Sequence, residues 1–135
     1  MTLRELSQLY WLRQEIVQYE ERLSRLRASM GVGAPNYDGM PHAHNHESIT
    51  ERQAVRLADL QRVLDDLRCR ACDEAIRLTE YIATIPDAYL RVIFTYRFVD
   101  GLTWWQVAAE MGGETTADSV RKACVRYLER GQDQG

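Results

Sequence analysis

Lysine, proline and long apolar runs are scarce in this chain of 135 residues. Only one of the seventeen basic residues is a lysine, Lys122. Arginine suits the recognition of phosphates and bases, although a GC-rich genome is the simpler explanation of the same bias. No apolar run approaches the length of a membrane span, and the N-terminal segment is amphipathic rather than a signal sequence. These features favour a cytoplasmic protein without a membrane partner.

Motifs for catalysis and for cofactor binding are also lacking. No Gly-rich phosphate loop, H-E-x-x-H motif or Gly-x-Ser-x-Gly motif occurs in the sequence. Cys69 and Cys72 have C-x-x-C spacing, but they lie in a helical pattern without a second Cys pair, which predicts buried or half-buried helix positions. His42, His44 and His46 alternate without Cys or carboxylate support, which indicates a solvated loop rather than a metal site. We therefore expect no enzyme activity, no cofactor and no bound metal.

Glycine and proline are absent from two long segments, residues 3–30 and 47–84. Each segment carries apolar residues at alternating steps of three and four, the a/d pattern of a coiled coil. In the first these are Leu9, Leu12, Ile16, Tyr19, Leu23, Leu26 and Met30, widened at the start by Leu3, Leu6 and Tyr10. In the second they are Leu57, Leu60, Leu64, Leu67, Ala71, Leu78, Tyr81 and Ile85, with Glu74 interrupting the pattern. The linker 31–46 between them is rich in turn-forming residues, so residues 1–84 are predicted to form an antiparallel helical hairpin.

A hairpin of two helices has little core of its own, so it needs a partner. A homodimer is the favoured case, with a higher homo-oligomer or another protein as alternatives. The second helix has a broader apolar face in its C-terminal half, which predicts contact with a second surface, either the following domain or another subunit. The residues that broaden it are Val63, Ala75, Ile76 and Ile82. Residues 47–84 carry a net charge of −2, from eight acidic residues and six arginines, and are a poor candidate for contact with nucleic acid.

Residues 85–130 contain three short helical patterns separated by two sharp breaks. Pro86 suits the first turn of a helix, whose apolar face is formed by Leu90, Ile93, Phe94 and Phe98. Asp100-Gly101 ends that helix. Thr103 with Gln106 forms a capping box for the second helix, whose buried residues are expected to be Val107, Ala108 and Met111. Gly112-Gly113 ends this helix, and either Thr115 or Thr116 caps the third.

The third helix, residues 116–130, has an apolar and a basic side. Its predicted inward residues are Val120, Ala123, Cys124, Tyr127 and Leu128. Its predicted outward basic residues are Arg121, Lys122, Arg126 and Arg130, and the helix is net +2 in a chain that is net −3. The last two patterns therefore predict a helix-turn-helix. The predicted fold is all-α: a long antiparallel helical hairpin, a three-helix helix-turn-helix domain at 85–130 and a flexible tail at 131–135.

The sequence GLTWWQVAAEMGG at 101–113, followed by TTADSVRKACVRYL at 115–128, resembles region four of the sigma-70 family, which binds a promoter element. The matching positions are Gly101, Leu102, Thr103, Val107, Ala108, Gly112, Val120 and Arg121. The resemblance covers about a third of the chain, and the turn after Gly112 is about two residues longer than in primary sigma factors. The layout of the whole chain also resembles a family of small uncharacterised phage and prophage proteins.

The resemblance implies double-stranded DNA as the partner and the third helix as the element that enters the major groove. The family's base-reading positions hold Ala117, Asp118, Ser119, Arg121 and Lys122. The candidate DNA-binding residues are these five together with Thr116, Arg126, Arg130 and Trp104. Arg121 and Lys122 are the candidates for base edges and Arg126 and Arg130 for phosphates. One of Trp104 and Trp105 is expected in the core and the other against the DNA backbone, with a structural role for both as the favoured alternative.

Three functions fit this reading of the sequence. The first is a DNA-binding transcription regulator, encoded by a phage or prophage, with the hairpin as its oligomerisation element. The second is a recognition subunit for DNA packaging, similar to small phage terminase subunits, which also combine helix-turn-helix domains with helical oligomerisation elements. The third is an interaction module whose sigma-like domain binds RNA polymerase rather than DNA. Residues 85–130 balance six acids against six bases, which keeps the third function open.

Overall fold

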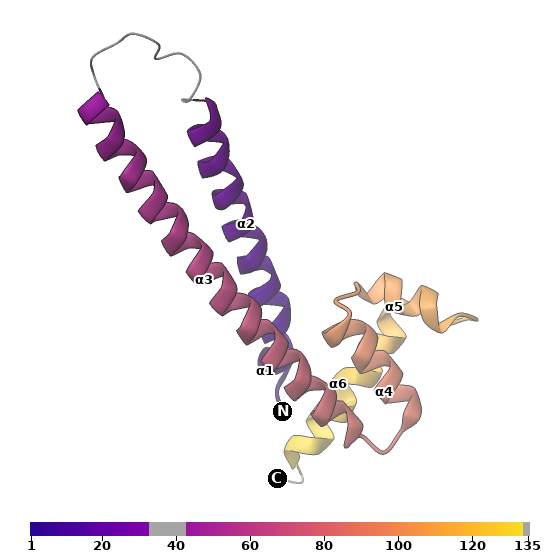
Figure 1. The fold of residues 1–135 in the computed structure, drawn as a ribbon. Helices are drawn as coiled ribbons and strands as arrows, with labels where there is room; N and C mark the ends of the chain where they lie inside the picture. The colour runs from indigo at the N-terminus through magenta and orange to yellow at the C-terminus, as the bar shows by residue number, and fades with distance from the viewer. Residues whose placement is uncertain (33–42, 134–135) are drawn as a thin grey trace. The chain divides into compact units, whose positions relative to one another are not determined.

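Helices make up all the secondary structure in the part of the chain that the computed structural model describes, residues 1–32 and 43–133 (Figure 1). The elements are α1 (Leu3–Leu6), α2 (Gln8–Val32), α3 (Ala43–Ala83), α4 (Ala88–Phe94), the π-helix η1 (Thr95–Val99), α5 (Trp104–Met111) and α6 (Ala117–Asp133). No strand occurs among these residues, which confirms the all-α prediction. None of the described helices is both long and apolar enough to cross a membrane.

The helix boundaries differ from the predicted ones at several points. α2 ends at Val32 and α3 begins at Ala43, so both ends of the predicted linker 31–46 are helical. α6 continues through Asp133, so most of the predicted tail at 131–135 is helical as well. Residues 33–42 and 134–135 lie outside the described residues, as does the side chain of every histidine in the predicted loop.

Contacts divide the chain into two compact units. The first unit comprises Met1–Leu12 and Ala71–Gly135, and the second comprises Arg13–Arg70. α2 and α3 contribute residues to both units. The boundary that the sequence analysis places between residues 84 and 85 therefore lies inside the first unit.

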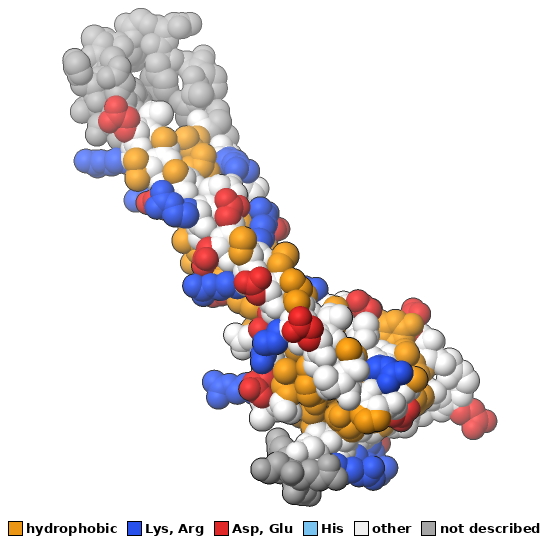
Figure 2. Space-filling model, turned by 60° about the horizontal axis from the view of Figure 1, so that its bottom comes forward, with side chains coloured by type: hydrophobic (Ala, Val, Ile, Leu, Met, Phe, Trp, Pro, Cys, Tyr) orange, Lys and Arg blue, Asp and Glu red, His pale blue; other side chains and the backbone are white. Residues whose placement is uncertain are grey.

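The second unit consists of the paired parts of α2 and α3. Arg27 Nη2 donates to Gln61 Oε1 at 3.2 Å, and Arg68 Nη2 lies 3.4 Å from Glu20 Oε1. The later residue of α2 thus meets the earlier residue of α3, so the two segments run antiparallel. Three seam residues are buried: Leu23, Leu64 and Leu67. The others are only half-buried, namely Ile16, Tyr19, Leu26, Met30, Leu57 and Leu60. Figure 2 shows orange apolar atoms between the mixed blue and red side chains of this unit.

The first unit is organised around a core to which six of its helical elements contribute buried residues. Its buried residues are Leu6, Leu9, Leu78, Ile82, Ile85, Phe94, Phe98, Cys124 and Leu128. Phe94 lies at its aromatic centre, with ring centroids 5.4 Å from Phe98, 5.7 Å from Tyr127 and 6.5 Å from Tyr81. Such tilted and edge-to-face arrangements are the favourable ones for aromatic rings. Ile82 and Ala75 pack in this core, whereas Ile76 is 58% exposed, so the broad face of the second long helix is only partly used within the chain.

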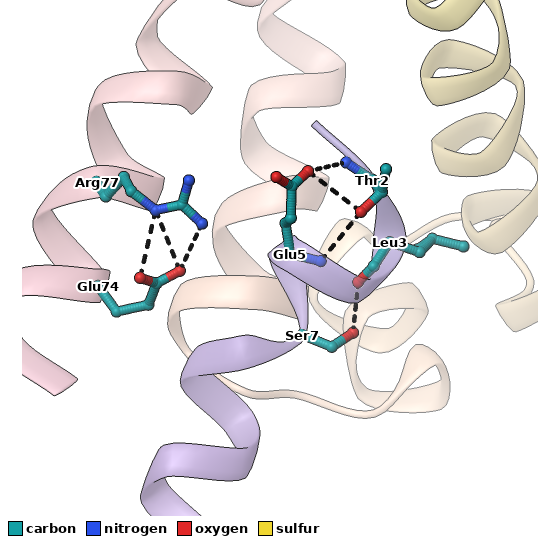
Figure 3. Close-up of polar contacts among 6 residues, drawn as sticks. All are labelled: Thr2, Leu3, Glu5, Ser7, Glu74 and Arg77. Atoms are coloured by element: carbon teal, nitrogen blue, oxygen red, sulfur yellow. Dashed lines mark hydrogen bonds and ion pairs between the residues drawn. The ribbon is translucent and has the colours of Figure 1, made fainter. Parts of the chain in front are cut away.

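The N-terminal helical segment is interrupted, although the sequence predicts one continuous helix from residue 3 to residue 30. Thr2 and Glu5 form a capping box, in which the Glu5 amide donates to Thr2 Oγ1 at 3.2 Å and the Thr2 amide donates to Glu5 Oε2 at 2.7 Å (Figure 3). The Thr2 amide and the Thr2 hydroxyl both donate to Glu5 Oε2, and these two bonds lower the pKa of the Glu5 carboxyl. Ser7 Oγ donates to the Leu3 carbonyl at 2.8 Å, and α1 ends at Leu6, directly before this serine. A serine bonded to the carbonyl four residues earlier often bends a helix, which explains the break.

Glu74, the one charged residue on the predicted apolar seam of α3, is accommodated by an ion pair. Its side chain is only 15% exposed, and its carboxylate lies 2.9 Å from Arg77 Nη2 (Figure 3). Hydrogen bonding to this carboxylate raises the pKa of Arg77. A carboxylate in this setting needs its partner, because a buried charge without one is costly.

Candidate nucleic-acid interface

α4 and η1 lead into α5 and α6, the two helices of the predicted helix-turn-helix. Asp87 caps α4, since its Oδ1 accepts from the Tyr89 amide at 3.0 Å. Pro86 therefore lies before the cap and not in the first turn, so that part of the prediction was wrong. The predicted apolar face is confirmed: Ile93, Phe94 and Phe98 are buried and Leu90 is half-buried. The predicted end of the helix is also found, because Asp100 terminates η1 and Gly101 has a φ of 74°.

α5 begins as the sequence predicts. The Gln106 amide donates to Thr103 Oγ1 at 3.2 Å, and the Thr103 amide donates to Gln106 Oε1 at 2.9 Å. This reciprocal pair is a capping box. Val107 and Ala108 are buried, and Met111 is half-buried, on the side that faces the rest of the unit.

The turn between α5 and α6 ends one helix and starts the next. Gly112 and Gly113 have φ values of 76° and 65°, which side chains with a Cβ rarely adopt. Thr116, rather than Thr115, caps α6: its Oγ1 accepts from the Ser119 amide at 3.1 Å, and its own amide donates to Ser119 Oγ at 3.1 Å. Thr116 and Ser119 are thus occupied in starting the helix. The helix itself begins at Ala117, one residue later than predicted.

α6 packs against α4 and α5 through the residues that the sequence assigns to its inner side. Val120 is fully buried in a small cluster with Ile93, Val107 and Ala108. Cys124 and Leu128 are buried in the main core, and Ala123 and Tyr127 are half-buried. Burial raises the pKa of the Cys124 thiol to about 12, so this thiol is neutral at ordinary pH and has a packing role.

The exposed surface of α6 presents the predicted basic residues to solvent. Arg121, Lys122, Arg126 and Arg130 are all exposed, whereas Ala117 is half-buried. Arg126 and Arg130 form no ion pair with any described residue. These four cations lie within ten residues of one helix, a length of roughly 14 Å, and at 3.6 residues per turn they are spread over about half of its circumference. Such a set of exposed cations is suited to contact several anionic groups.

Asp118 partly neutralises the two cations nearest the start of α6. Its Oδ1 lies 3.0 Å from Arg121 Nη2, and its Oδ2 lies 2.8 Å from Lys122 Nζ. The bonds from Lys122 and then from Arg121 lower the pKa of the Asp118 carboxyl, so it stays ionised. Asp118 was named from the sequence as a candidate base-reading residue, and its double pairing was not predicted. The spacing of three and four residues along a helix is the signal that was available for it.

The two adjacent tryptophans lie in different environments. Trp104 is half-buried, with its ring 6.4 Å from that of Phe98 and the Arg97 guanidinium carbon 4.7 Å above it. Arg97 also donates from Nη1 to the Leu102 carbonyl at 3.0 Å, so it stabilises the loop before α5. Trp105 is 78% exposed. Of the two rings, Trp105 is therefore the one available to a partner, although Trp104 is the one in the candidate set.

The remaining candidate residues do not form a second site. Cys69 and Cys72 are exposed, so their predicted burial was wrong; α3 is one helix of a pair here, and its outer side is solvated. No group of three potential metal ligands occurs among the described residues. His42 lies outside the described residues, and so do the side chains of His44 and His46.

Comparison of the chain with protein-family models, with curated proteins and with solved structures gave no match. The resemblance to region four of the sigma-70 family therefore stays a prediction. What bears on function is the geometry of α5, the turn and α6, together with the charges that α6 presents.

Proposed function

We propose that this protein is a DNA-binding transcription regulator, encoded by a phage or prophage, that reads the major groove with α6. In this proposal α5, the glycine turn and α6 form a helix-turn-helix within a three-helix domain. The observation that carries it is the division of α6 into two sides. One side is buried through Val120, Cys124 and Leu128, and the remaining surface of the helix exposes four cations.

The proposed docking follows from the position of each cation along α6. The N-terminal turns of the second helix enter the groove in this class of domain, while the preceding helix crosses the backbone. Arg121 and Lys122 lie in the second turn of α6 and would reach base edges. Arg126 and Arg130 lie one and two turns further on and would contact phosphates. Trp105, exposed in the first turn of α5, is placed on the helix that would cross the backbone.

The antiparallel pair of α2 and α3 is proposed as the oligomerisation element, a helical hairpin that binds a second copy of the chain. Six seam residues of the second unit are only half-buried by the pairing within one chain. A half-buried a/d seam can pack against the same seam of a second chain, because the two seams have the same seven-residue repeat. Sedimentation equilibrium of the full chain is expected to give a dimer or a larger species. A monomer at micromolar concentration would contradict this part of the proposal.

Two alanine variants test the DNA-binding proposal. Arg121→Ala is expected to weaken binding to the preferred duplex by about 1–3 kcal/mol and to relax its sequence preference, because a base contact is lost. Arg126→Ala is expected to weaken binding to all duplexes alike and to reduce the slope of log K against log salt by about one, because a phosphate contact is lost. The preferred duplex is first selected from a random-sequence library with the unaltered protein.

The outcome of the same experiment separates the alternatives. If neither variant changes binding to any duplex, while either one abolishes association with RNA polymerase, the protein is an interaction module and the groove-binding model is wrong. If DNA binding is retained but sedimentation and electron microscopy give a closed ring, the packaging-subunit alternative takes the place of a dimeric regulator.

A further inference from the structure

The two cations closest to the start of α6 share one carboxylate. Arg121 and Lys122 each donate to a different oxygen of Asp118, at 3.0 Å and 2.8 Å. The three side chains are between 49% and 59% exposed, so this cluster faces solvent. The cations further along α6, Arg126 and Arg130, make no such pair with the described residues. The cations of α6 are therefore partly neutralised only near the start of the helix, the end proposed to reach the bases.

We propose that Asp118 is the specificity-determining residue of the DNA-binding surface, because it withholds Arg121 and Lys122 from arbitrary phosphates and orients Arg121 toward guanine. This inference rests on the proposed function. Arg121 uses one nitrogen, Nη2, for Asp118. A guanidinium has five donors in a planar fork, so donors remain for a second, bidentate contact. Guanine presents two adjacent acceptors, O6 and N7, in the major groove and matches this fork.

The charge of Asp118 acts differently on specific and non-specific DNA. Against an arbitrary sequence, Arg121 and Lys122 would have to leave the carboxylate to reach phosphates, and the carboxylate itself is repelled by the backbone. Against the preferred sequence, Arg121 keeps its bond to Asp118 while its remaining donors contact the base. Asp118 thus weakens non-specific binding more than specific binding, which increases the ratio between the two affinities.

The test compares Asp118→Asn with a matched variant on the same helix, Glu129→Gln. Both substitutions remove one negative charge from an exposed position of α6, but Glu129 lies eleven residues from Asp118 and makes no ion pair with the described residues. Binding to the library-selected duplex and to a mixed-sequence duplex is measured over a series of NaCl concentrations. A melting curve for each variant checks that the fold is retained, and Asp118→Glu serves as the conservative variant that keeps the charge.

Asp118→Asn is expected to bind the mixed-sequence duplex several-fold more tightly, with a log–log salt slope steeper by up to about one. The ratio of affinities for the selected and mixed duplexes is expected to fall roughly tenfold, as for the loss of one oriented base contact. Glu129→Gln is expected to change both affinities by the same factor, and Asp118→Glu to retain most of the ratio. In the Arg121→Ala background, Asp118→Asn should lower the ratio no further, because the residue it orients is gone.

Two results would overturn the inference. One is an affinity ratio that Asp118→Asn changes no more than Glu129→Gln does. The other is an equal loss of ratio in Asp118→Glu, which would assign the effect to the start of α6 rather than to the carboxylate. Either result leaves the proposed function standing as long as Arg121→Ala weakens the selected duplex. Failure of the proposed function has a different signature, namely that the library yields no preferred duplex and that Arg121→Ala and Arg126→Ala both bind as the unaltered protein does.

Discussion

Replacement of Leu6 with alanine is expected to destabilise the core around α6, although the two are more than a hundred residues apart in sequence. Leu6 and Leu9 are both 0% exposed, and they lie in the same core as Phe94, Cys124 and Leu128. Truncating a fully buried leucine costs about 2–5 kcal/mol, since the transfer free energy of the side chain is lost and a cavity is left. A domain of this size has a total stability of roughly 5–15 kcal/mol. The substitution should therefore remove a large share of the stability of the first unit while leaving it folded at room temperature.

The buried thiol of Cys124 offers a direct assay for this loss. It is 0% exposed and reacts only when the core opens, whereas Cys69 and Cys72 are exposed and can be replaced with serine beforehand. If opening is fast compared with labelling, the labelling rate follows the opening equilibrium. A loss of about 3 kcal/mol then accelerates labelling of Cys124 on the order of a hundredfold, at about 1.4 kcal/mol for each factor of ten.

Leu3→Ala is the matched control, because Leu3 belongs to the same short helix but is 44% exposed. It is expected to change the labelling rate by less than about tenfold, since exposed substitutions usually cost little. Leu9→Ala should behave as Leu6→Ala does. If Leu6→Ala and Leu9→Ala accelerate labelling no more than Leu3→Ala, the assignment of the N-terminal residues to this core is wrong.

Two further predictions concern the second unit and the dependence of stability on pH. Leu64→Asp places a charge at a position that is 2% exposed, so it is expected to lower the free energy of unfolding in urea by about 3 kcal/mol or more. Val55→Asp, at a position 61% exposed on the same helix, should lower it little. Equal effects of the two substitutions would contradict the burial of Leu64 between α2 and α3. Burial raises the pKa of Cys124 from 9.0 to about 12. Between pH 9.0 and about pH 12 the unfolded chain therefore loses a proton that the folded chain keeps. The free energy of unfolding then falls by up to about 1.4 kcal/mol for each pH unit. Urea unfolding at pH 8 and pH 10 should show a larger decrease for the unaltered protein than for Cys124→Ala, and an identical decrease in both would refute this.

The local features of the fold were predictable from sequence because they depend on residues close together in the chain. The capping box of Thr103 and Gln106 requires two residues three apart, and both of its hydrogen bonds are present. Gly112 has the positive φ that its position at a helix end requires. The inner side of α6 follows from the helical period, and Val120 and Cys124 are fully buried as predicted. In each case the physical cause lies within one or two helical turns.

The features that were not predicted from the sequence depend on tertiary packing or on a choice between two local interactions that are both possible. Ser7 was read as part of a continuous helix, because an intrahelical bond from a serine hydroxyl to a carbonyl is optional. Trp104 and Trp105 are the same residue type at adjacent positions, and only tertiary packing determines which of the two rings is buried. The pairing of Asp118 with both Arg121 and Lys122 was detectable from spacing, but Asp118 was named as a candidate base-reading residue.

The seven-residue repeat predicts that a residue is buried, but it does not predict which residues pack against it. For this reason the boundaries of the candidate DNA-binding domain could not be predicted from the sequence. Residues 85–130 were expected to form a domain by themselves. In the structure, the core beneath α4 and α6 also contains Leu6 and Leu9 from the N-terminal segment and Leu78 and Ile82 from the end of α3. A fragment limited to 85–130 would expose the faces of Phe94 and Leu128 that those residues cover, and it would lose four buried aliphatic side chains worth about 1.5–3 kcal/mol each. That loss is comparable with the whole stability of a small domain. The region that presents α6 to DNA in the proposed function therefore needs residues from the N-terminal segment and from the end of α3 to complete its core.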